Sequence, residues 1–586
     1  MKAIVNSLNV KFNYVAIDSQ YDFFTVTTTD KYISGGAYIL DKPVTALKAE
    51  SVSFDGGRSL FVMFKKNTIT LYDFVEHIED EKLSVKKIKS TNIKDYVLFR
   101  LFLFSLNNFE NDELKFNNIT GKLFIYSNKW MRKDRAAFKT LSLKVNSEMN
   151  FICEAVSFAL FSKFSKNKKV KDYAKYELSN KNNALKRVLQ TESKDNIYIK
   201  HALNGRKAEL SFLNISPEEL HNNKVYYIYY VLDLLKNKFD GLFELDFATI
   251  NMLQSIGTTK GNAFIEKAIA ELREKPLNFV NMTKGSEYAD DFRDLVGRLS
   301  IRTGINGTVS DKVKSGANNI ILIHNKEYYE QNGYEDPHTT LPHDEVVQCV
   351  TVEDSLDKIL DDKEAIINTI IKEVAIKNDI LFKHSFSLDD WQSYGFDKDW
   401  VLGKESGGRN YFMIVHPNGE FEFSVKLNDF KPFADKRINE ISKILSENKG
   451  KEKTVVADAD GNINVFSRTD IFTLPNKEIF GMDLVSRSKE SRETNLAGLV
   501  DINLFEAESN TYFNVGIRGY GMNTNIPHAP LLYKVDKINN SKNLLPSLME
   551  TMSVEFVKYK SFTVLPYPMK YLNEWILVND FQKSTR

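Results

Sequence analysis

Apolar and polar residues alternate along the first 145 residues in the way that half-buried strands require. The segments FFTVTT, SLFVMF, TITLYDFV and KLFIYS are rich in β-branched and aromatic residues, and Gly, Asn and Asp bound them. This pattern predicts strands in each segment and a β-rich α+β domain over residues 1–150.

The pattern changes after residue 150. The segment NFICEAVSFALFSKF carries apolar residues at helical spacing, and the basic run KFSKNKKVKDYAKY (163–176) follows it. Further along, NAFIEKAIAELREK (262–275) predicts an amphipathic helix. We therefore expect residues 151–317 to form a mixed helical linker region, which either stands alone or includes the start of the next domain.

From residue 318 the pattern becomes that of an α/β domain. NNIILIHN and VVQCVTV are short, fully apolar segments of the kind that form buried strands of a parallel sheet. KEAIINTIIKEVAIK (363–377) has its isoleucines at helical spacing and predicts a helix. Residues 318–400 are thus predicted to be one α/β domain.

Residues 401–586 combine strands and helices in another order. NYFMIVHPNGEFEFSVKL predicts two strands around a Pro-Asn-Gly turn, FADKRINEISKILSEN a helix, and TVVADADG a strand that ends in Gly461. This order of β, turn, β, helix and β resembles an RNase-H-type layout. A further helix is expected around 544–558.

Composition narrows the class of protein. A chain of 586 residues is too long for one hydrophobic core, and a typical domain size of about 150 residues suggests about four domains. The net charge of +1 means that any nucleic-acid surface must arise from local segregation of charge. Two cysteines exclude a disulfide scaffold. No stretch reaches the roughly 18 apolar residues of a membrane span, and no signal peptide is apparent, so we expect a cytoplasmic protein without membrane contact.

The last 70 residues resemble the end of a PIWI domain, the catalytic module of the Argonaute family. GMNTNIPHAPLLYKVD (521–536) is similar to the family's Gly-Thr-Arg-Pro-like turn and exposed strand. Upstream, VVADADGN is similar to the PIWI strand that ends in Arg-Asp-Gly, with Asp460 at the matching aspartate. The matches at the end of the following helix and in the closing Leu-Pro-x-Pro-x-x-Tyr-like segment are Tyr559, Lys560, Leu565, Pro566, Pro568 and Tyr571.

The preceding α/β unit resembles a Rossmann-like MID domain, the Argonaute module that holds the 5′ end of a guide. The family pattern has a Tyr and a Lys four residues apart, then a Gln, then Lys residues that close a helix. The matching residues are Tyr334, His338, Gln348, Lys372 and Lys377, with His338 in place of the first Lys. The resemblance implies that they bind a 5′ phosphate, with Mg²⁺ either there or at a residual PIWI site. If the resemblance is set aside, Gln348 is an ordinary strand residue, and Lys372 and Lys377 are solvated residues near the end of a helix, where they interact favourably with its dipole.

The resemblance also implies a test for cleavage, because PIWI enzymes hold two divalent ions on four residues, most of them acidic. On the first strand, NYFMIVHPNG, the matching position is His416 or a neighbour, and the first carboxylate is Glu420. A neutral imidazole does not replace a carboxylate between two hard cations. Asp460 would then be a remnant of the site, and we expect a PIWI domain without cleavage activity.

Two further positions of the tetrad stay open. His528 in NIPHAP matches the closing residue, but it is equally well a histidine of a turn. For the glutamate of the intervening loop, both Glu440 and Glu447 are available. A metal-dependent PIWI endonuclease that uses Asp460 is therefore an alternative, and a protein–protein scaffold that binds no nucleic acid is a second.

The resemblance covers roughly residues 318–586 and leaves little room for a PAZ domain, as in compact or divergent prokaryotic Argonautes. It implies a protein that binds a short guide DNA or RNA and its complementary target. Such a protein would recruit an effector (a nuclease, a helicase or a NAD-consuming toxin) in defence against plasmids or phage. Basic segments with interleaved aromatic residues, at 86–96, 129–139 and 163–176, are candidates for backbone binding or are plain solvated faces. The residues predicted to contact the nucleic-acid backbone are Lys129, Arg132, Lys133, Arg135, Lys166, Lys168 and Lys169.

Overall fold

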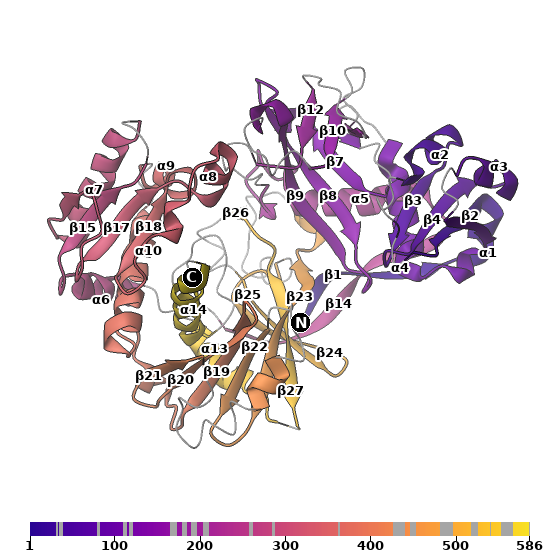
Figure 1. The fold of residues 1–586 in the computed structure, drawn as a ribbon. Helices are drawn as coiled ribbons and strands as arrows, with labels where there is room; N and C mark the ends of the chain where they lie inside the picture. The colour runs from indigo at the N-terminus through magenta and orange to yellow at the C-terminus, as the bar shows by residue number, and fades with distance from the viewer. Residues whose placement is uncertain are drawn as a thin grey trace.

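The chain folds into several sheets with helices packed between and around them (Figure 1). The predicted mixture of helices and strands is confirmed. The computed structural model describes residues 1–30, 33, 39–78, 82–108, 114–116, 121–164, 173–178, 185–188, 196–202, 210–256, 262–283, 287–360, 364–425, 440–445, 453–480, 496–516, 525–539, 541–552 and 566–584.

The largest sheet joins strands from both halves of the chain, and each of its pairs is antiparallel. Its first two strands come from the N-terminal half, so this half is hydrogen-bonded directly into a sheet built from residues 400–538. In spatial order the ten strands are β1 (Lys2–Phe12), β14 (Phe243–Ile256), β24 (Ile502–Ala507), β25 (Asn510–Val515), β27 (Leu531–Ile538), β23 (Ile463–Leu474), β22 (Lys453–Asp458), β19 (Trp400–Ser406), β20 (Arg409–Val415) and β21 (Phe421–Ser424).

The predicted hairpin and the strand that follows it are present as β20, β21 and β22. The helix expected between them is helical over residues 440–445, the part that is described. β22 runs antiparallel to β19, and β21 runs parallel to β19, so the helical crossover returns the chain antiparallel to β21. Such crossovers usually join parallel strands. The RNase-H-like description of this sheet therefore stays a prediction.

Two antiparallel sheets and one short pair hold most of the remaining N-terminal residues, and the strands predicted at FFTVTT, SLFVMF and KLFIYS are confirmed. The helices around them are α1 (Tyr14–Gln20), α2 (Asp41–Ala46), α4 (Asp95–Phe104) and α5 (Lys224–Lys238). The four-stranded sheet contains β3 (Ser51–Asp55), β4 (Ser59–Lys65), β2 (Tyr21–Thr28) and β5 (Leu83–Ile88). The seven-stranded sheet contains β11 (Leu185–Val188), β10 (Lys175–Leu178), β12 (Ile197–Ile199), β9 (Phe151–Leu160), β8 (Ala137–Val145), β7 (Leu123–Ser127) and β6 (Leu114–Phe116). The short pair is β13 (Leu213–Asn214) with β26 (Asn525–Ile526).

Two elements differ from the prediction. The segment TITLYDFV does not form a strand; it forms α3 (Leu71–Glu76), because Thr70 and Asp73 make a reciprocal capping box that starts a helix. The segment after residue 150 is not a helix but β9, which pairs with β8 from Phe151 to Ala159. A short apolar run fits both periods, and here the neighbouring strand decides the outcome.

A separate four-stranded sheet is parallel, as predicted for NNIILIHN and VVQCVTV. Its order is β16 (Thr308–Ser310), β15 (Leu277–Asn281), β17 (Asn318–Ile323) and β18 (Val347–Thr351). β15 and β16 precede residue 318, so the sheet begins inside residues 151–317. The sequence pattern assigns this segment either to a separate linker region or to one that includes the start of the next domain. Its helices are α6 (Asn262–Leu272), α7 (Ala289–Thr303), α8 (Lys326–Asn332), α9 (Asp357–Leu360) and α10 (Glu364–Asn378), the last close to the predicted helix at 363–377.

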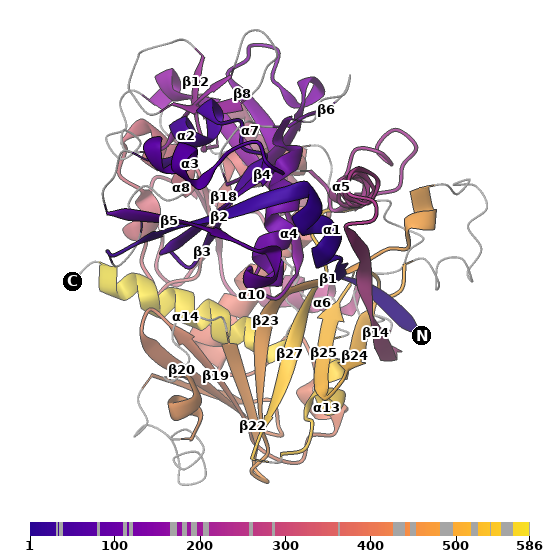
Figure 2. The same ribbon diagram turned by 90° about the vertical axis from the view of Figure 1, so that its right-hand side faces the viewer.

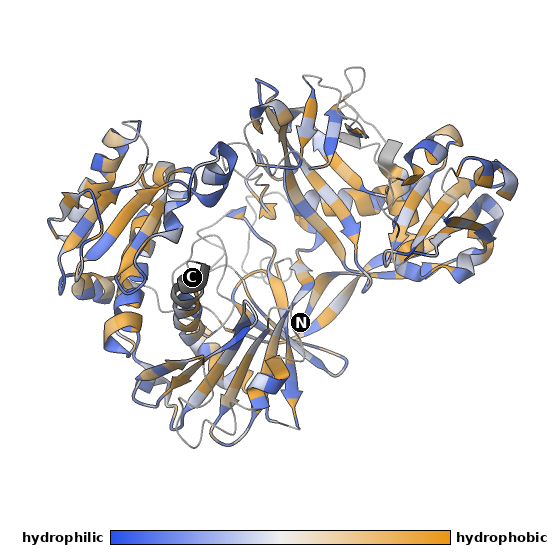
Figure 3. Ribbon diagram, in the orientation of Figure 1, coloured by the Kyte–Doolittle hydropathy of each residue, from blue (hydrophilic) through white to orange (hydrophobic). Residues whose placement is uncertain are grey.

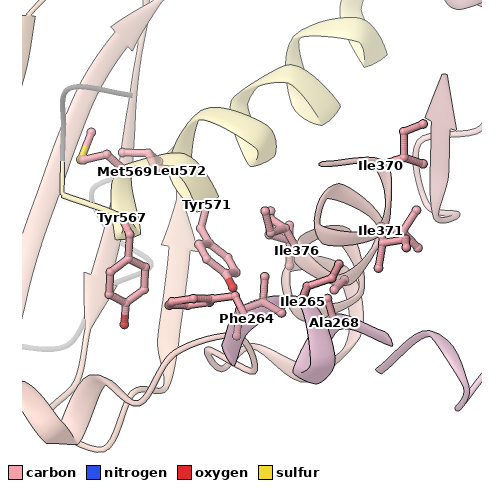
Figure 4. Close-up of a cluster of buried hydrophobic side chains, with 14 of the residues drawn as sticks. Phe264, Ile265, Ala268, Ile370, Ile371, Ile376, Tyr567, Met569, Tyr571 and Leu572 are labelled. Carbon is pink, nitrogen blue, oxygen red and sulfur yellow. The ribbon is translucent and has the colours of Figure 1, made fainter. Parts of the chain in front are cut away.

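The parallel sheet and the ten-stranded sheet share one hydrophobic core. The predicted C-terminal helix is present as α13 (Leu545–Met552), and α14 (Pro568–Ser584) crosses beside β19 and β20 and meets α10 (Figure 2). Figure 4 shows Tyr571 of α14 extending towards Ile376 of α10 and Phe264 of α6, and all three side chains are buried. Apolar residues gather along the strands of each sheet in the same way (Figure 3). Among the described residues, no helix has the length and hydropathy of a membrane span.

A buried ion-pair cluster ties α14 to α10. Lys570 Nζ lies 2.8 Å from Glu373 Oε1 and 2.6 Å from Glu574 Oε1, and all three side chains are less than 15% exposed. Burial disfavours the charged form of Lys570, but the two carboxylates raise its pKa above the ordinary value. Buried charges are stable only when they are paired, so the two helices depend on this lysine.

We predict that Lys570→Met lowers the free energy of unfolding by about 3–5 kcal/mol, because it leaves two buried carboxylates without a cation. Urea unfolding of the full chain measures this change. Lys144→Met is the matched control, since Lys144 binds Glu154 at 3.0 Å on the surface and should cost at most about 1 kcal/mol. Equal losses in the two variants would contradict the role of the cluster.

Candidate nucleic-acid binding site

Two of the predicted phosphate ligands are in direct contact at the start of β18. Lys377 Nζ donates to Gln348 Oε1 at 2.8 Å and to the carbonyl of Val347 at 2.6 Å. Gln348 Nε2 donates to the carbonyl of Cys349 at 3.1 Å. Within the described part of the chain, the bonds of Lys377 use two of its three ammonium donors, and the third is available to an anion.

Tyr334 and His338 lie in the segment that connects α8 with β18. His338 Nδ1 is 2.6 Å from Asp336 Oδ1, and Asp336 also accepts from the backbone N–H of His338 at 3.0 Å. The ring centroid of His338 is 6.5 Å from that of Tyr329, and the ring of Tyr334 is 6.5 Å from that of Tyr328. Tyr334 is 44% exposed. The imidazole is therefore held by a carboxylate, beside a group of tyrosine rings.

Burial raises the pKa of the thiol of Cys349, the residue after Gln348, to about 11; the charge of Lys377 opposes the shift and the charge of Asp336 adds to it. His338 is held by Asp336 in the connection that precedes β18. The structure thus brings two of the five predicted phosphate ligands, Gln348 and Lys377, into contact at the start of β18.

Lys372 is not among them. Five residues of helix correspond to a rotation of about 140°, so Lys372 and Lys377 leave α10 on different faces. The side chain of Lys372 is 7% exposed. The phosphate contact of Lys372 stays a prediction, and the burial of this residue on another face of α10 does not favour it.

The charge of Lys377 also reaches two carboxylates of the Lys570 cluster. Burial opposes the ionisation of Glu574, but the charges of Lys570 and Lys377 hold its pKa below the ordinary value. Burial raises the pKa of Glu373, and Lys570 opposes that shift. Because both carboxylates already bind one ammonium group, they do not fit the role of Mg²⁺ ligands beside a phosphate.

Asp379 fixes the chain directly after α10. Its Oδ2 accepts from the backbone N–H and the hydroxyl of Ser387, each at 2.9 Å, and from the Tyr571 hydroxyl at 2.8 Å. The carboxyl group is fully buried. Burial raises its pKa to about 6, although these three donors favour the charged form.

This pKa predicts a stability that falls as the pH rises. The folded state holds the proton of Asp379 more tightly than the unfolded chain, whose pKa is near 3.8. The contribution is therefore fully present below about pH 4 and is lost as the pH rises through about 6, a change of about 3 kcal/mol in the free energy of unfolding. Urea unfolding at pH 4.5 and pH 7 measures it, and Asp379→Asn should lack this part of the pH dependence. Asp390→Asn, at an exposed position, should keep it; identical pH profiles for all three proteins would contradict the assignment.

The opposite edge of the parallel sheet holds a buried pair that sequence reasoning missed. His324 follows β17, Glu353 follows β18, and His324 Nδ1 lies 2.6 Å from Glu353 Oε1. The His324 ring stacks on Tyr328 with centroids 3.7 Å apart and an angle of 11°. The sequence signal for this pair was the position of the two residues, each directly after a strand of the parallel sheet. Polar residues at such positions meet at the carboxyl edge of the sheet, where α/β proteins bind ligands.

The two aspartates of VVADADGN have different surroundings. Asp458, 7% exposed, closes the turn by accepting from the backbone N–H and the side-chain amide of Asn462 at 2.9 and 2.8 Å. Asp460 is exposed, and its Oδ2 lies 2.5 Å from Lys398 Nζ. This hydrogen bond with Lys398 lowers the pKa of Asp460. The candidate metal ligand of the PIWI resemblance thus forms an exposed ion pair with a lysine.

The remaining tetrad candidates lie apart from Asp460 or have other partners. His416 Nδ1 is 2.9 Å from Asp399 Oδ1, and its Nε2 is 3.4 Å from Glu422 Oε1. His528 is exposed between β26 and β27, Glu440 is the first described residue of the helical segment before β22, and Glu447 lies outside the described residues. Within the described ranges, no three His, Cys, Asp or Glu side chains are close enough to share a metal ion.

The predicted backbone-binding residues are in part described. Lys129, Arg132, Lys133 and Arg135 are exposed in the connection between β7 and β8. The other three, Lys166, Lys168 and Lys169, lie outside the described residues, as do Tyr559, Lys560 and Leu565 of the PIWI-like motifs.

In the segment 86–96, two lysines have structural partners. Lys87 lies 2.9 Å from the buried carboxylate of Asp22, and Lys94 lies 3.0 Å from Asp55. Both lysines thus stabilise the N-terminal four-stranded sheet. This leaves the connection between β7 and β8 as the stronger candidate for a nucleic-acid surface.

Comparison of the sequence with protein families and with curated proteins gives no match. Among solved structures, the chain is similar to the crystal structure of A. aeolicus Argonaute. The two share 8% sequence identity and a TM-score of 0.37, with 98% of this chain and 97% of that chain covered. A similarity at this TM-score decides neither fold nor function, so the proposals below rest on the motifs and contacts of this chain.

Proposed function

We propose that this chain is an Argonaute-like protein that binds a short guide nucleic acid by its 5′ phosphate and recognises complementary strands. The observation that carries the proposal is the contact of Lys377 with Gln348 at the start of β18. An ammonium group with a remaining donor forms strong, charge-assisted hydrogen bonds with a terminal phosphate. The MID-like and PIWI-like motifs of the sequence support the same function.

In this proposal, base pairing reads the target sequence and the protein holds the backbone. The proposed guide is either DNA or RNA. A protein distinguishes the two nucleic acids by the shape of the backbone and by contacts to the 2′-hydroxyl. Phosphate binding is expected to need no Mg²⁺, because Lys570 already occupies the neighbouring carboxylates Glu373 and Glu574.

We propose further that the bound target recruits a protein effector, either a nuclease, a helicase or a NAD-consuming toxin, in cytoplasmic defence against plasmids or phage. Support for this part comes from the family resemblance alone. Affinity purification of the chain with and without a complementary target tests it, and an effector that binds only with target is the expected result.

The direct test is extraction and end-labelling of nucleic acid that co-purifies with the chain. Short strands with 5′ phosphates are expected. A preparation that contains none, and that fails to bind them when they are offered, would replace this proposal with a protein–protein scaffold.

We predict that Gln348→Ala with Lys377→Ala weakens binding of a 5′-phosphorylated guide by about 10- to 100-fold, the range for one or two charge-assisted hydrogen bonds. Binding of the same strand with a 5′ hydroxyl should change less than about threefold on the same scale. Fluorescence anisotropy measures both. Lys326→Ala, exposed on α8, is the control for loss of one charge, and equal losses for the two guides would disprove a phosphate pocket.

We predict that the guide-loaded chain does not cut a complementary target in Mg²⁺ or Mn²⁺, because His416 or a neighbour stands at the position of the first tetrad carboxylate and an imidazole does not bridge two hard cations. Denaturing gel electrophoresis of an end-labelled target measures this, and Asp460→Ala should bind target as the wild type does. Metal-dependent products that disappear in Asp460→Ala would instead establish the endonuclease alternative.

A further inference from the structure

One end of the seven-stranded sheet collects basic residues from several connections. The register places Lys175, Ile199, Ala159 and Ala137 in one row across β10, β12, β9 and β8. The chain enters or leaves the sheet just beyond this row. We call the following described residues at this end the basic rim: Lys129, Arg132, Lys133, Arg135, Lys163, Lys175 and Lys200, with Asp134.

The rim is strongly positive in a nearly neutral chain. Its seven cations and one carboxylate sum to +6 (7 − 1), whereas the formal charge of the whole chain is +1. Asp134 binds Arg132 at 3.3 Å, and the charge of Lys163 reaches the same carboxylate. Local segregation of this size produces a positive potential that attracts polyanions.

Aromatic rings lie among these cations. Tyr173 is 43% exposed, and its ring centroid is 6.1 Å from that of His201 at an angle of 30°. The His201 ring in turn packs on the buried Phe164 at 4.7 Å. Lys175 Nζ lies 4.5 Å from the centroid of the Phe161 ring. The rim therefore has a supported aromatic surface beside its positive charges.

The rim and the Gln348–Lys377 pair belong to different sheets. The opposite ends of β8 and β9 approach β1 through the bridge between Ser7 and Asn150. The rim thus points away from the ten-stranded sheet, towards the top of Figure 1 near the labels of β10 and β12.

We propose that the basic rim binds single-stranded nucleic acid, with its lysines and arginines on the phosphates and an unpaired base stacked on Tyr173. Alternating cations and rings are the features that sequence-independent binding of single strands requires. A duplex keeps its base faces stacked internally, so it uses the charges but not the ring. This surface adds to the proposed function and does not depend on a 5′ phosphate.

The test measures binding of 5′-hydroxyl single strands, both DNA and RNA, to the full chain by fluorescence anisotropy over a range of salt. Replacing the exposed Lys133, Lys163 and Lys200 by Gln should weaken binding about tenfold or more. Three lost phosphate contacts should make the slope of log K against log salt less negative by about 2. The control replaces Lys267, Lys312 and Lys326 by Gln, which removes the same charge from exposed positions of the parallel-sheet unit.

A second pair of variants tests the ring. Tyr173→Ala should weaken single-strand binding about 5- to 100-fold, Tyr173→Phe should retain it, and duplex binding should change in neither. The Gln348→Ala, Lys377→Ala protein should bind 5′-hydroxyl strands as the wild type does, which separates this proposal from the phosphate pocket. Equal affinities of the rim variant and the control variant for single strands would overturn the proposal. A higher affinity of the wild-type chain for an acidic peptide than for a single strand would overturn it as well.

Discussion

The contact between α10 and α14 is the constraint on which the candidate site depends. Glu373 and Asp379, on either side of Lys377, are bound to Lys570 and Tyr571 of α14. The ammonium group that faces Gln348 is therefore held between two anchored residues. The position of Lys377 relative to β18 therefore depends on how α14 packs against α10.

Lysine ammonium groups bind acidic side chains at two places in the described structure. Lys398 binds Asp460, and Lys570 binds both Glu373 and Glu574. A lysine ammonium supplies a single fixed charge and three donors, whereas Mg²⁺ brings two charges and demands octahedral oxygen ligands. These lysines therefore compete with a metal ion for Asp460, Glu373 and Glu574.

Local pattern predicted much of the secondary structure, and failures came from interactions that one segment does not contain. SLFVMF and NNIILIHN were readable because their composition suits only buried strands. TITLYDFV was not, because the capping box of Thr70 and Asp73 outweighs β propensity. Of the site, Gln348 and Lys377 were found through the resemblance. The salt bridge of Lys398 with Asp460 and the aromatic contacts of Tyr173 were beyond reach, since they join residues whose distance in space the sequence does not encode.

The pairing of β1 with β14 sets the order in which the chain can fold. These strands begin 241 residues apart (243 − 2), and β14 in turn pairs with β24, which starts at Ile502. At about 5–20 residues per second, β1 waits on the order of 10–50 s during synthesis for its partner. Its backbone edge stays without its β14 partner for that time, and an unpaired strand edge is a point for chaperone binding and for aggregation when synthesis stalls.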